Sequence, residues 1–294
     1  SGGLLSIYFL YLHIPFDVIS SSIENSVSSI FHFNGSVLTD SNLFINGLIG
    51  GTFLSFASHG VDYMMVQRAL SCKDLPSARK AMIGSGIFVF IQFSIFLLVG
   101  TLLNQYFQLV DLTAINPNIA SDYLDSSFNV LKDRELPLLI NSYLPIGIRG
   151  ILLVGVLSAA MSTLSSSINS LSSSTLRDIL DVEDNIKLSK AISVFWAFAL
   201  IFIASVFDES NNLLLITGLR IASFTYGILL SLFLLRLLNI KPKNLELIIA
   251  SMCGILSVFI MQSQGVSWTW FVLGSTIITM SLSIILSPIF PADE

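Results

Sequence analysis

The residues best suited to chemistry form a run of hydroxyl side chains between positions 157 and 174. The run reads LSAAMSTLSSSINSLSSS and carries hydroxyls where a surface helix would carry charges. On a helix, at about 100° per residue, the small and polar residues share one face. That face holds Ala159, Ser162, Thr163, Ser166, Asn169, Ser170 and Ser173. Hydroxyl and carbonyl oxygens are hard ligands, suited to a hard, weakly polarising cation. Small residues also let helices pack closely, so a packing role stays open.

Three ionisable side chains interrupt apolar stretches, where such groups are costly and usually functional. His59 and Asp62 are three residues apart, so we expect them on one helix face. They either form a cap or salt bridge with Arg68 or take part in gating or solute release. Arg220 lies about nine residues into another apolar stretch. It pairs either with an anionic solute such as a carboxylate or with an upstream helix or the outer loop.

The composition places these residues in a membrane protein. Of 294 residues, 53% are hydrophobic and 11% charged, and the mean hydropathy is +0.82; soluble proteins carry roughly a quarter charged residues. This balance excludes a soluble or disordered chain, and nothing indicates a nucleic-acid partner. Cys72 and Cys253 lie far apart with no neighbouring His or acidic cluster, so we expect neither a disulfide nor a metal site built on cysteine.

Hydropathy predicts about seven membrane-spanning helices. They run near 42–66, 80–103, 146–172, 189–207, 211–236, 244–263 and 268–287. The opening stretch, Leu4 to Ile19, is short and interrupted by Pro15, so we expect an interfacial or re-entrant segment. Residues 104–145 are too long for a simple turn and predict an outer loop with helices of its own.

Basic residues orient the spans. Ten of the 14 Lys and Arg residues fall in alternate loops, around 68–80, 177–190 and 236–243. By the positive-inside rule these loops face the cytoplasm, which places the N-terminus of this segment outside and its C-terminus inside the plasma membrane. The chain opens on Ser1 without a methionine or a signal peptide. Together with the odd number of spans, this predicts that upstream helices of the same protein are missing.

Two sequence blocks resemble one family of membrane transporters. Residues 145–170, PIGIRGILLVGVLSAAMSTLSSSINS, are similar to the eighth core helix of the sodium:solute symporter family. Residues 58–70, SHGVDYMMVQRAL, resemble the family's G-x-D/N-Q-x-x-V-Q-R-x-L segment, which ends the sixth core helix. A weaker match, Tyr226-Gly227 ahead of Phe233, falls in the tenth core helix.

The resemblance implies an all-α membrane protein with a leucine-transporter-like inverted-repeat fold. Residues 1–41 would form an extracellular or interfacial segment. Residues 42–240 would form the second five-helix repeat, core helices six to ten, with the outer loop at 104–145. Residues 241–294 would form two peripheral helices and a C-terminal tail.

The resemblance also implies the ligands of the coupling ion. The main sodium site of the family matches the carbonyl of Ala159 and the hydroxyls of Ser162 and Thr163. A second sodium ion, present in some members, would use the hydroxyls of Ser162, Ser165 and Ser166. Its acidic ligand lies in the fifth core helix, which we expect to be absent from this chain. Sodium would be the coupling ion, and no organic cofactor is implied.

The function implied is sodium-coupled symport of a small solute by alternating access. The solute would be a sugar, an amino acid or a carboxylate-bearing molecule, and its site would lie at the midplane between the two repeats. Ser55, Ser58, His59, Asp62 and Arg220 are candidates for solute contact or gating. Ser58 matches an aromatic inner gate of some sugar transporters, and Tyr63 replaces the amide that usually follows the acid.

Three other functions remain as alternatives. A sodium-independent transporter of the same fold would use the same helices, and a transporter-like sensor would need a signalling domain that this chain does not carry. An intramembrane serine protease using His59 would need a G-x-S-G sequence, but Gly84-Ser85-Gly86 follows Ile83. We therefore expect a transporter and not an enzyme.

Overall fold

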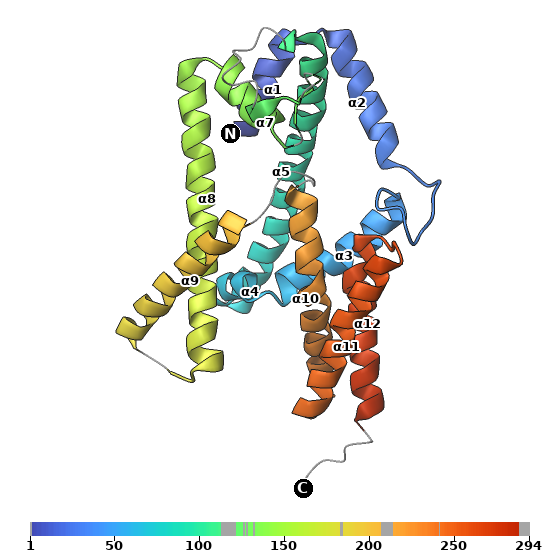
Figure 1. The fold of residues 1–294 in the computed structure, drawn as a ribbon, viewed down its shortest axis with the longest axis vertical. Helices are drawn as coiled ribbons and strands as arrows, with labels where there is room; N and C mark the ends of the chain where they lie inside the picture. Colours follow the sequence, from blue (N-terminus) through green and yellow to red (C-terminus); the bar gives the residue numbers. More distant parts are fainter. Residues whose placement is uncertain are drawn as a thin grey trace. The chain divides into compact units, whose positions relative to one another are not determined.

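A computed structural model gives the fold, and nearly all of its ordered segments are helices (Figure 1). The structure describes residues 2–112, 122–125, 127, 129–131, 133–182, 185–206, 214–240 and 242–287. In these residues the extended pairing is limited to one isolated bridge between Leu124 and Val130. The chain divides into two compact units. Unit 1 comprises Ser1–Ser26 with Gly84–Leu214, and unit 2 comprises Val27–Ile83 with Leu215–Glu294.

Six helices in the described part of the chain are long and apolar enough to cross a membrane. They are Leu75–Leu109, Ile146–Ile179, Ile186–Val206, Leu214–Leu237, Asn244–Ser263 and Trp268–Leu286. The chain is therefore a multi-pass membrane protein. All six coincide with predicted spans, although the predicted edges differ by several residues.

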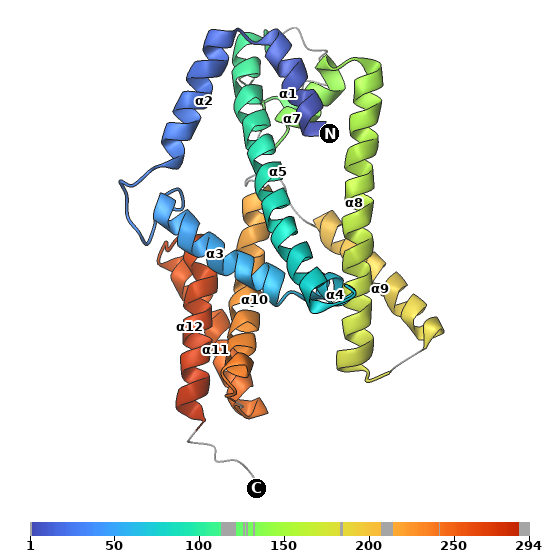
Figure 2. The same cartoon turned by 180° about the vertical axis from the view of Figure 1, so that it is seen from behind.

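The remaining predicted span, 42–66, is not one continuous helix. It consists of α3 (Phe44–Gly60) and α4 (Tyr63–Leu70), separated at Val61 and Asp62 (Figure 2). At 1.5 Å per residue, the 17 residues of α3 are ~26 Å long, slightly less than the hydrocarbon thickness of a bilayer. Hydropathy averaged over a window does not detect such a break.

Unit 1 begins with two helices that meet at Pro15. They are α1 (Gly2–His13) and α2 (Phe16–Ile30), of which the last four residues belong to unit 2. The helices α5 (Leu75–Leu109, of which the first nine residues belong to unit 2), α8 (Ile146–Ser174) and α9 (Ile186–Val206) follow. The segment predicted to form an outer loop contains α7 (Glu135–Leu138) and the π-helix η2 (Leu139–Tyr143), so it has helices as expected, while 113–121 lie outside the described residues.

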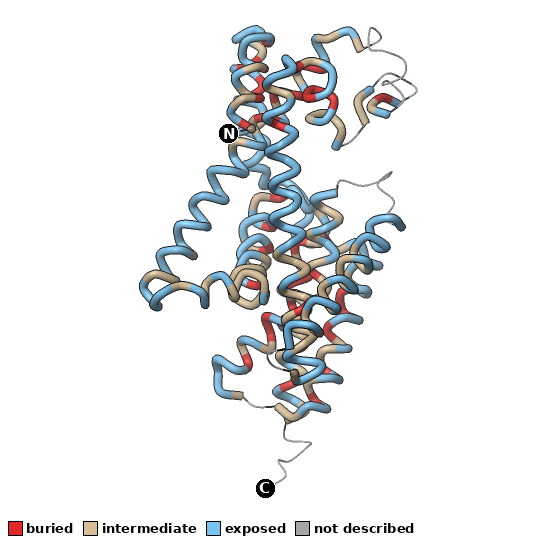
Figure 3. The backbone as a smooth tube through the Cα atoms, turned by 90° about the vertical axis from the view of Figure 1, so that its left-hand side faces the viewer, coloured by how far each residue is buried: buried red, intermediate tan, exposed pale blue. Residues whose placement is uncertain are grey.

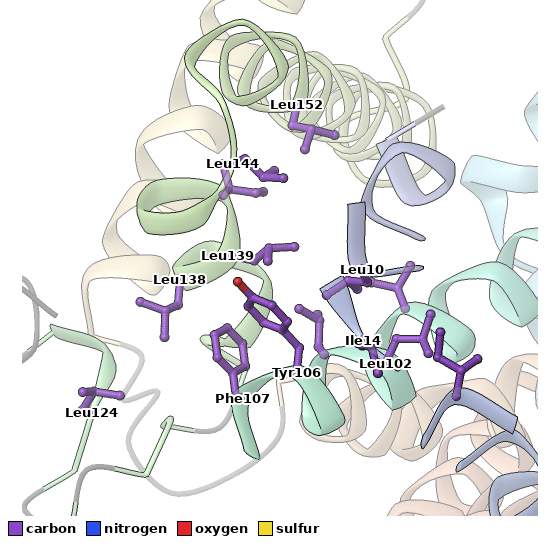
Figure 4. Close-up of a cluster of buried hydrophobic side chains, with 14 residues drawn as sticks. Leu10, Ile14, Leu102, Tyr106, Phe107, Leu124, Leu138, Leu139, Leu144 and Leu152 are labelled. Carbon is purple, nitrogen blue, oxygen red and sulfur yellow. The ribbon is translucent and has the colours of Figure 1, made fainter. Parts of the chain in front are cut away.

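The core of unit 1 joins α1, the second half of α5 and the outer loop (Figure 4). Leu10, Leu138 and Leu139 are fully buried, and Tyr106 stacks edge-to-face on Tyr143 with 5.4 Å between ring centroids. Buried segments are few along the backbone (Figure 3), and α8 buries only Leu152 and Ser172. The core therefore fixes the first turns of α8 and leaves the first half of its hydroxyl run, 157–165, exposed among the described residues.

Unit 2 contains α3, α4, α10 (Leu214–Leu237, from its second residue), α11 (Asn244–Ser263) and α12 (Phe271–Leu286), which the short 3-10 helix η4 (Trp268–Trp270) precedes. Glycines and hydroxyls join these helices. The Cβ position of Gly227 on α10 faces the Val272 carbonyl oxygen of α12 at 2.7 Å. The Thr276 hydroxyl donates to the Gly227 carbonyl at 3.0 Å. Lipid gives helices no hydrophobic reason to associate, so close packing and hydrogen bonds of this kind hold membrane bundles together.

The loop before α3 is fixed to the start of α12. The Trp270 indole N–H donates to the Val37 carbonyl at 2.6 Å, and the Ser267 amide donates to the Leu38 carbonyl at 2.7 Å. The Asn46 amide, buried in the first turn of α3, donates to the carbonyls of Val37 and Asp40. These bonds position α3 against α12 independently of the helix break that follows.

The contact at Gly227 gives a stability prediction. Gly227→Ala places a methyl group against the backbone of α12, and we expect a loss of about 1–3 kcal/mol of stability from overpacking. Gly218→Ala, on the same helix where the added Cβ meets no atom within 4 Å, is the control. Thermal unfolding of the purified protein in detergent measures both. Equal melting temperatures for the two variants would contradict the packing described here.

Candidate functional site

The predicted sodium ligands lie on the middle of α8. Ala159, Ser162, Thr163 and Ser165 are exposed to surrounding space, and Ser166 is half-buried. Pro145, with an extended backbone, precedes α8, and no charged side chain follows Arg149 within the helix. A helix of this length can therefore carry hydroxyls at membrane depth, since its backbone satisfies its own hydrogen bonds.

Two of the predicted ligand atoms are already adjacent. The Thr163 hydroxyl donates to the Ala159 carbonyl oxygen, with 3.1 Å between the two oxygens. A hydroxyl that donates one hydrogen bond keeps lone pairs free to accept, and a carbonyl oxygen has two. The Thr163 oxygen can therefore face a cation beside the Ala159 carbonyl, which already accepts from that hydroxyl. The structure records no hydrogen bond from the Ser162 hydroxyl to another described residue, so this oxygen has no competing partner among them.

The predicted second set is less compact. The Ser166 hydroxyl donates to the Ser162 carbonyl at 2.9 Å, in the same pattern as Thr163 and Ala159. Ser165 lies on α8 with an exposed side chain. The helix thus brings Ser162 and Ser166 together, and their role in binding a second ion remains a prediction.

The end of α8 is fastened to α9. The Ser172 and Ser193 hydroxyls are 3.0 Å apart, and the Trp196 indole donates to the Thr175 hydroxyl at 3.0 Å. Thr175 begins the π-helix η3 (Thr175–Ile179) and donates to the Leu171 carbonyl. These contacts lie about two and a half to four and a half turns beyond Thr163 and Ala159, so α9 supports the helix without covering the predicted ligands.

An apolar cavity of about 240 Å³ within unit 1 reaches Ala159. It lies between α1, α5 and α8, and its lining includes Gly3, Phe96, Leu152, Gly155 and Ala159. Ala159, whose carbonyl is a predicted sodium ligand, therefore lies at the edge of this cavity.

Ser55, Ser58 and His59 form a local cluster in the last turns of α3. The Ser58 hydroxyl donates to the Ser55 carbonyl at 3.2 Å, and it lies 2.9 Å from His59 Nδ1. His59 Nδ1 is also 3.2 Å from the Ser55 carbonyl. These bonds lie within α3, and the predicted roles in solute contact or gating stay predictions.

The expectation that His59 and Asp62 share one helix face is wrong. His59 is the penultimate residue of α3, whereas Asp62 is the extended residue that caps α4, with φ −64° and ψ 121°. The Asp62 carboxylate accepts a hydrogen bond from the Met64 amide at 2.8 Å, so the predicted capping role has a structural basis. The reason for the break is local, because an aspartate favours the N-cap position over a helix interior.

Sequence reasoning missed the partner of Asp62 on α10. The Tyr226 hydroxyl donates to the second carboxylate oxygen of Asp62 at 2.8 Å. The signal that pointed nearby was the Tyr226-Gly227 match, but sequence gives no pairing between residues 164 positions apart. The bond joins two of the three motif blocks within unit 2.

Arg220 lies six residues after Leu214, where α10 begins, with an exposed side chain. It forms no ion pair with a described residue. The acidic residues of the preceding outer loop, Asp208 and Glu209, lie outside the described residues. Its pairing with a solute carboxylate therefore remains a prediction.

Comparison with known proteins agrees with these features. The model of the sodium:solute symporter family matches residues 21–241. The sodium/sialic acid symporter SiaT of Proteus mirabilis (strain HI4320) is 27% identical over 188 residues, which cover 58% of this chain and 36% of that protein. A solved structure, the substrate-bound outward-open state of a Na⁺-coupled sialic acid symporter, is 20% identical and superposes with a TM-score of 0.77.

The superposition covers 98% of this chain and 59% of the solved one, which confirms the predicted leucine-transporter-like fold. The chain thus spans about a third to three fifths of the length of these relatives. Since the family match takes in α3, α4, α8 and α10, it includes every candidate residue described above. The chain belongs to the sodium:solute symporter family.

Proposed function

We propose that this chain serves sodium-coupled symport of a small organic solute across the plasma membrane. The observation that carries the proposal is the family match, which includes α8 with the adjacent oxygens Ala159 O and Thr163 Oγ1. Sodium is held by the Ala159 carbonyl and by the hydroxyls of Ser162 and Thr163. Ser165 and Ser166 contribute to a second ion with Ser162. Further ligands come from outside α8.

Coupling follows from the difference in sodium affinity between two conformations. Sodium binds more tightly when the site opens outward, and it can shift the equilibrium only by that difference. Solute then binds, the outer side closes, and both leave towards the cytoplasm, where sodium is dilute. We place the basic loops and the C-terminus in the cytoplasm and the N-terminus of this chain outside. We also propose that residues 42–240 form core helices six to ten and that two peripheral helices follow residue 240.

The relatives suggest a solute class. Both are named for sialic acid, which is a sugar bearing a carboxylate. We propose that Arg220 pairs with a solute carboxylate, because a guanidinium binds a carboxylate through two parallel hydrogen bonds. Ser55, Ser58, His59 and Asp62 act at the end of α3 in gating or release of the solute.

The sodium site is tested by removing one hydroxyl without changing the shape of the side chain. In proteoliposomes with an inward sodium gradient, we expect Thr163→Val to raise the sodium concentration for half-maximal uptake at least about tenfold, because a ligand is lost. Thr101→Val is the matched control, since Thr101 on α5 donates to the Leu97 carbonyl at the same 3.1 Å.

Uptake of radiolabelled sialic acid and of neutral sugars and amino acids by the full-length protein gives this measurement. Uptake that ignores the sodium gradient would replace the proposal with a sodium-independent transporter of the same fold. If the sodium dependence changed equally in Thr163→Val and Thr101→Val, Thr163 would not be a sodium ligand.

The role of Arg220 is tested with a charged solute and its neutral analogue. We expect Arg220→Gln to weaken sialic acid uptake at least about tenfold in KM, since a hydrogen bond to a charged group is lost. Competition by the methyl ester of sialic acid should change little. Arg236→Gln, near the other end of α10, is the control. Unchanged KM for sialic acid in Arg220→Gln would contradict the pairing.

A further inference from the structure

The break between α3 and α4 is built around one carboxylate. The amides of Val61 and Asp62 both donate to the Ala57 carbonyl, at 3.0 and 3.2 Å, and this ends α3. Asp62 Oδ1 then accepts from the Met64 amide and caps α4. Its Oδ2 accepts from the Tyr226 hydroxyl of α10. The two oxygens of this half-buried carboxylate therefore accept from two different helices, α4 and α10.

The α10 side of this bond is firmly held. Gly227, next to Tyr226, is buried against α12, and its carbonyl accepts from Thr276 at 3.0 Å. Tyr226 packs against a buried cluster of Ala57, Leu230 and Val272, which come from α3, α10 and α12. The Tyr226 hydroxyl is therefore presented from a rigid three-helix contact.

The α4 side is less buried. The helix has eight residues, none of which is buried, and an isolated helix of this length is unstable in water. Asp62 caps its first turn, and the Tyr226 hydroxyl ties this cap to α10. The bond thus joins a helix packed against α3 and α12 to one in which no residue is fully buried.

We propose that Asp62 and Tyr226 form a latch that positions α4 and opens during the transport cycle. With the latch closed, this hydrogen bond holds the start of α4 at α10. We place the basic loop that follows in the cytoplasm. With the latch open, α4 can swing away about the break at Val61 and Asp62 while the cap keeps its first turn helical. Both are positioning residues, and this inference rests on the sodium-coupled cycle proposed above.

The latch is tested by hydrogen–deuterium exchange of the full-length protein in nanodiscs, with and without sodium. In Tyr226→Phe we expect the amides of residues 63–66 to exchange at least about fivefold faster, because a hydrogen bond to a charged acceptor is lost. In the wild type, sodium should slow exchange of these amides, since it favours the outward-open state with the cytoplasmic side closed. In Tyr226→Phe this sodium effect should be lost.

Three further variants separate the latch from ordinary stabilisation. Asp62→Ser keeps an N-cap side chain but cannot reach Tyr226, so it should behave as Tyr226→Phe does. The double variant should exchange no faster than either single one, as expected for two partners in one contact. Tyr63→Phe, an exposed tyrosine beside Asp62 with no recorded hydrogen bond, is the control and should leave exchange unchanged.

The outcomes distinguish this inference from the proposed function. Unchanged exchange at 63–66 in Tyr226→Phe would overturn the latch, and so would a sodium effect of the wild-type size in that variant. Absence of a sodium effect in the wild type would also overturn it, because the contact would then be independent of the cycle. A sodium-sensitive latch without sodium-driven uptake in proteoliposomes would support the latch and reject symport.

Discussion

The constraint on which this structure depends is that a backbone in lipid has no water to satisfy its hydrogen bonds. A helix satisfies its backbone hydrogen bonds along its length. Oxygens that can bind a further partner are therefore those of side-chain hydroxyls and those at helix ends. The α8 face is the first case, because Thr163 and Ser166 donate to carbonyls four residues back and keep lone pairs available. The break at Asp62 is the second case, because its carboxylate accepts from the Met64 amide, which a continuous helix would have bonded to a backbone carbonyl.

The same constraint explains how the helices of each unit are joined. Hydroxyls that donate to a carbonyl of their own helix leave room for close approach, and α12 buries Ser275 and Ser283 in this way. In unit 1 the contacts are different, since α8 is fixed by the Leu152 region at its start and by Ser172 and Thr175 near its end. The middle of α8, where the predicted ligands lie, is the part that described residues cover least.

Predictions from the sequence succeeded where a property repeats over many residues. Six of the spans were found because 20 or so apolar residues outweigh any single polar one. The 42–66 span was misjudged because a cap is a single-residue event, and Asp62 was interpreted as a charge on a helix rather than as its beginning. The outer-loop helices were expected from length alone, and α7 and η2 occupy part of that loop. The division at residues 41 and 240 remains a prediction. Both compact units include residues on either side of 41, and unit 2 continues across 240.

By itself, the sequence determined that this is a helical membrane protein, which stretches span, and which family the two motif blocks resemble. These features are local, because hydropathy, helical periodicity and motif spacing are properties of neighbouring residues. Only the tertiary structure decided that Asp62 meets Tyr226, that Gly227 is a contact with α12, and that an open space reaches Ala159. Such pairings join residues far apart in the chain, and they are set by how helices pack, which the order of residues along one helix does not contain.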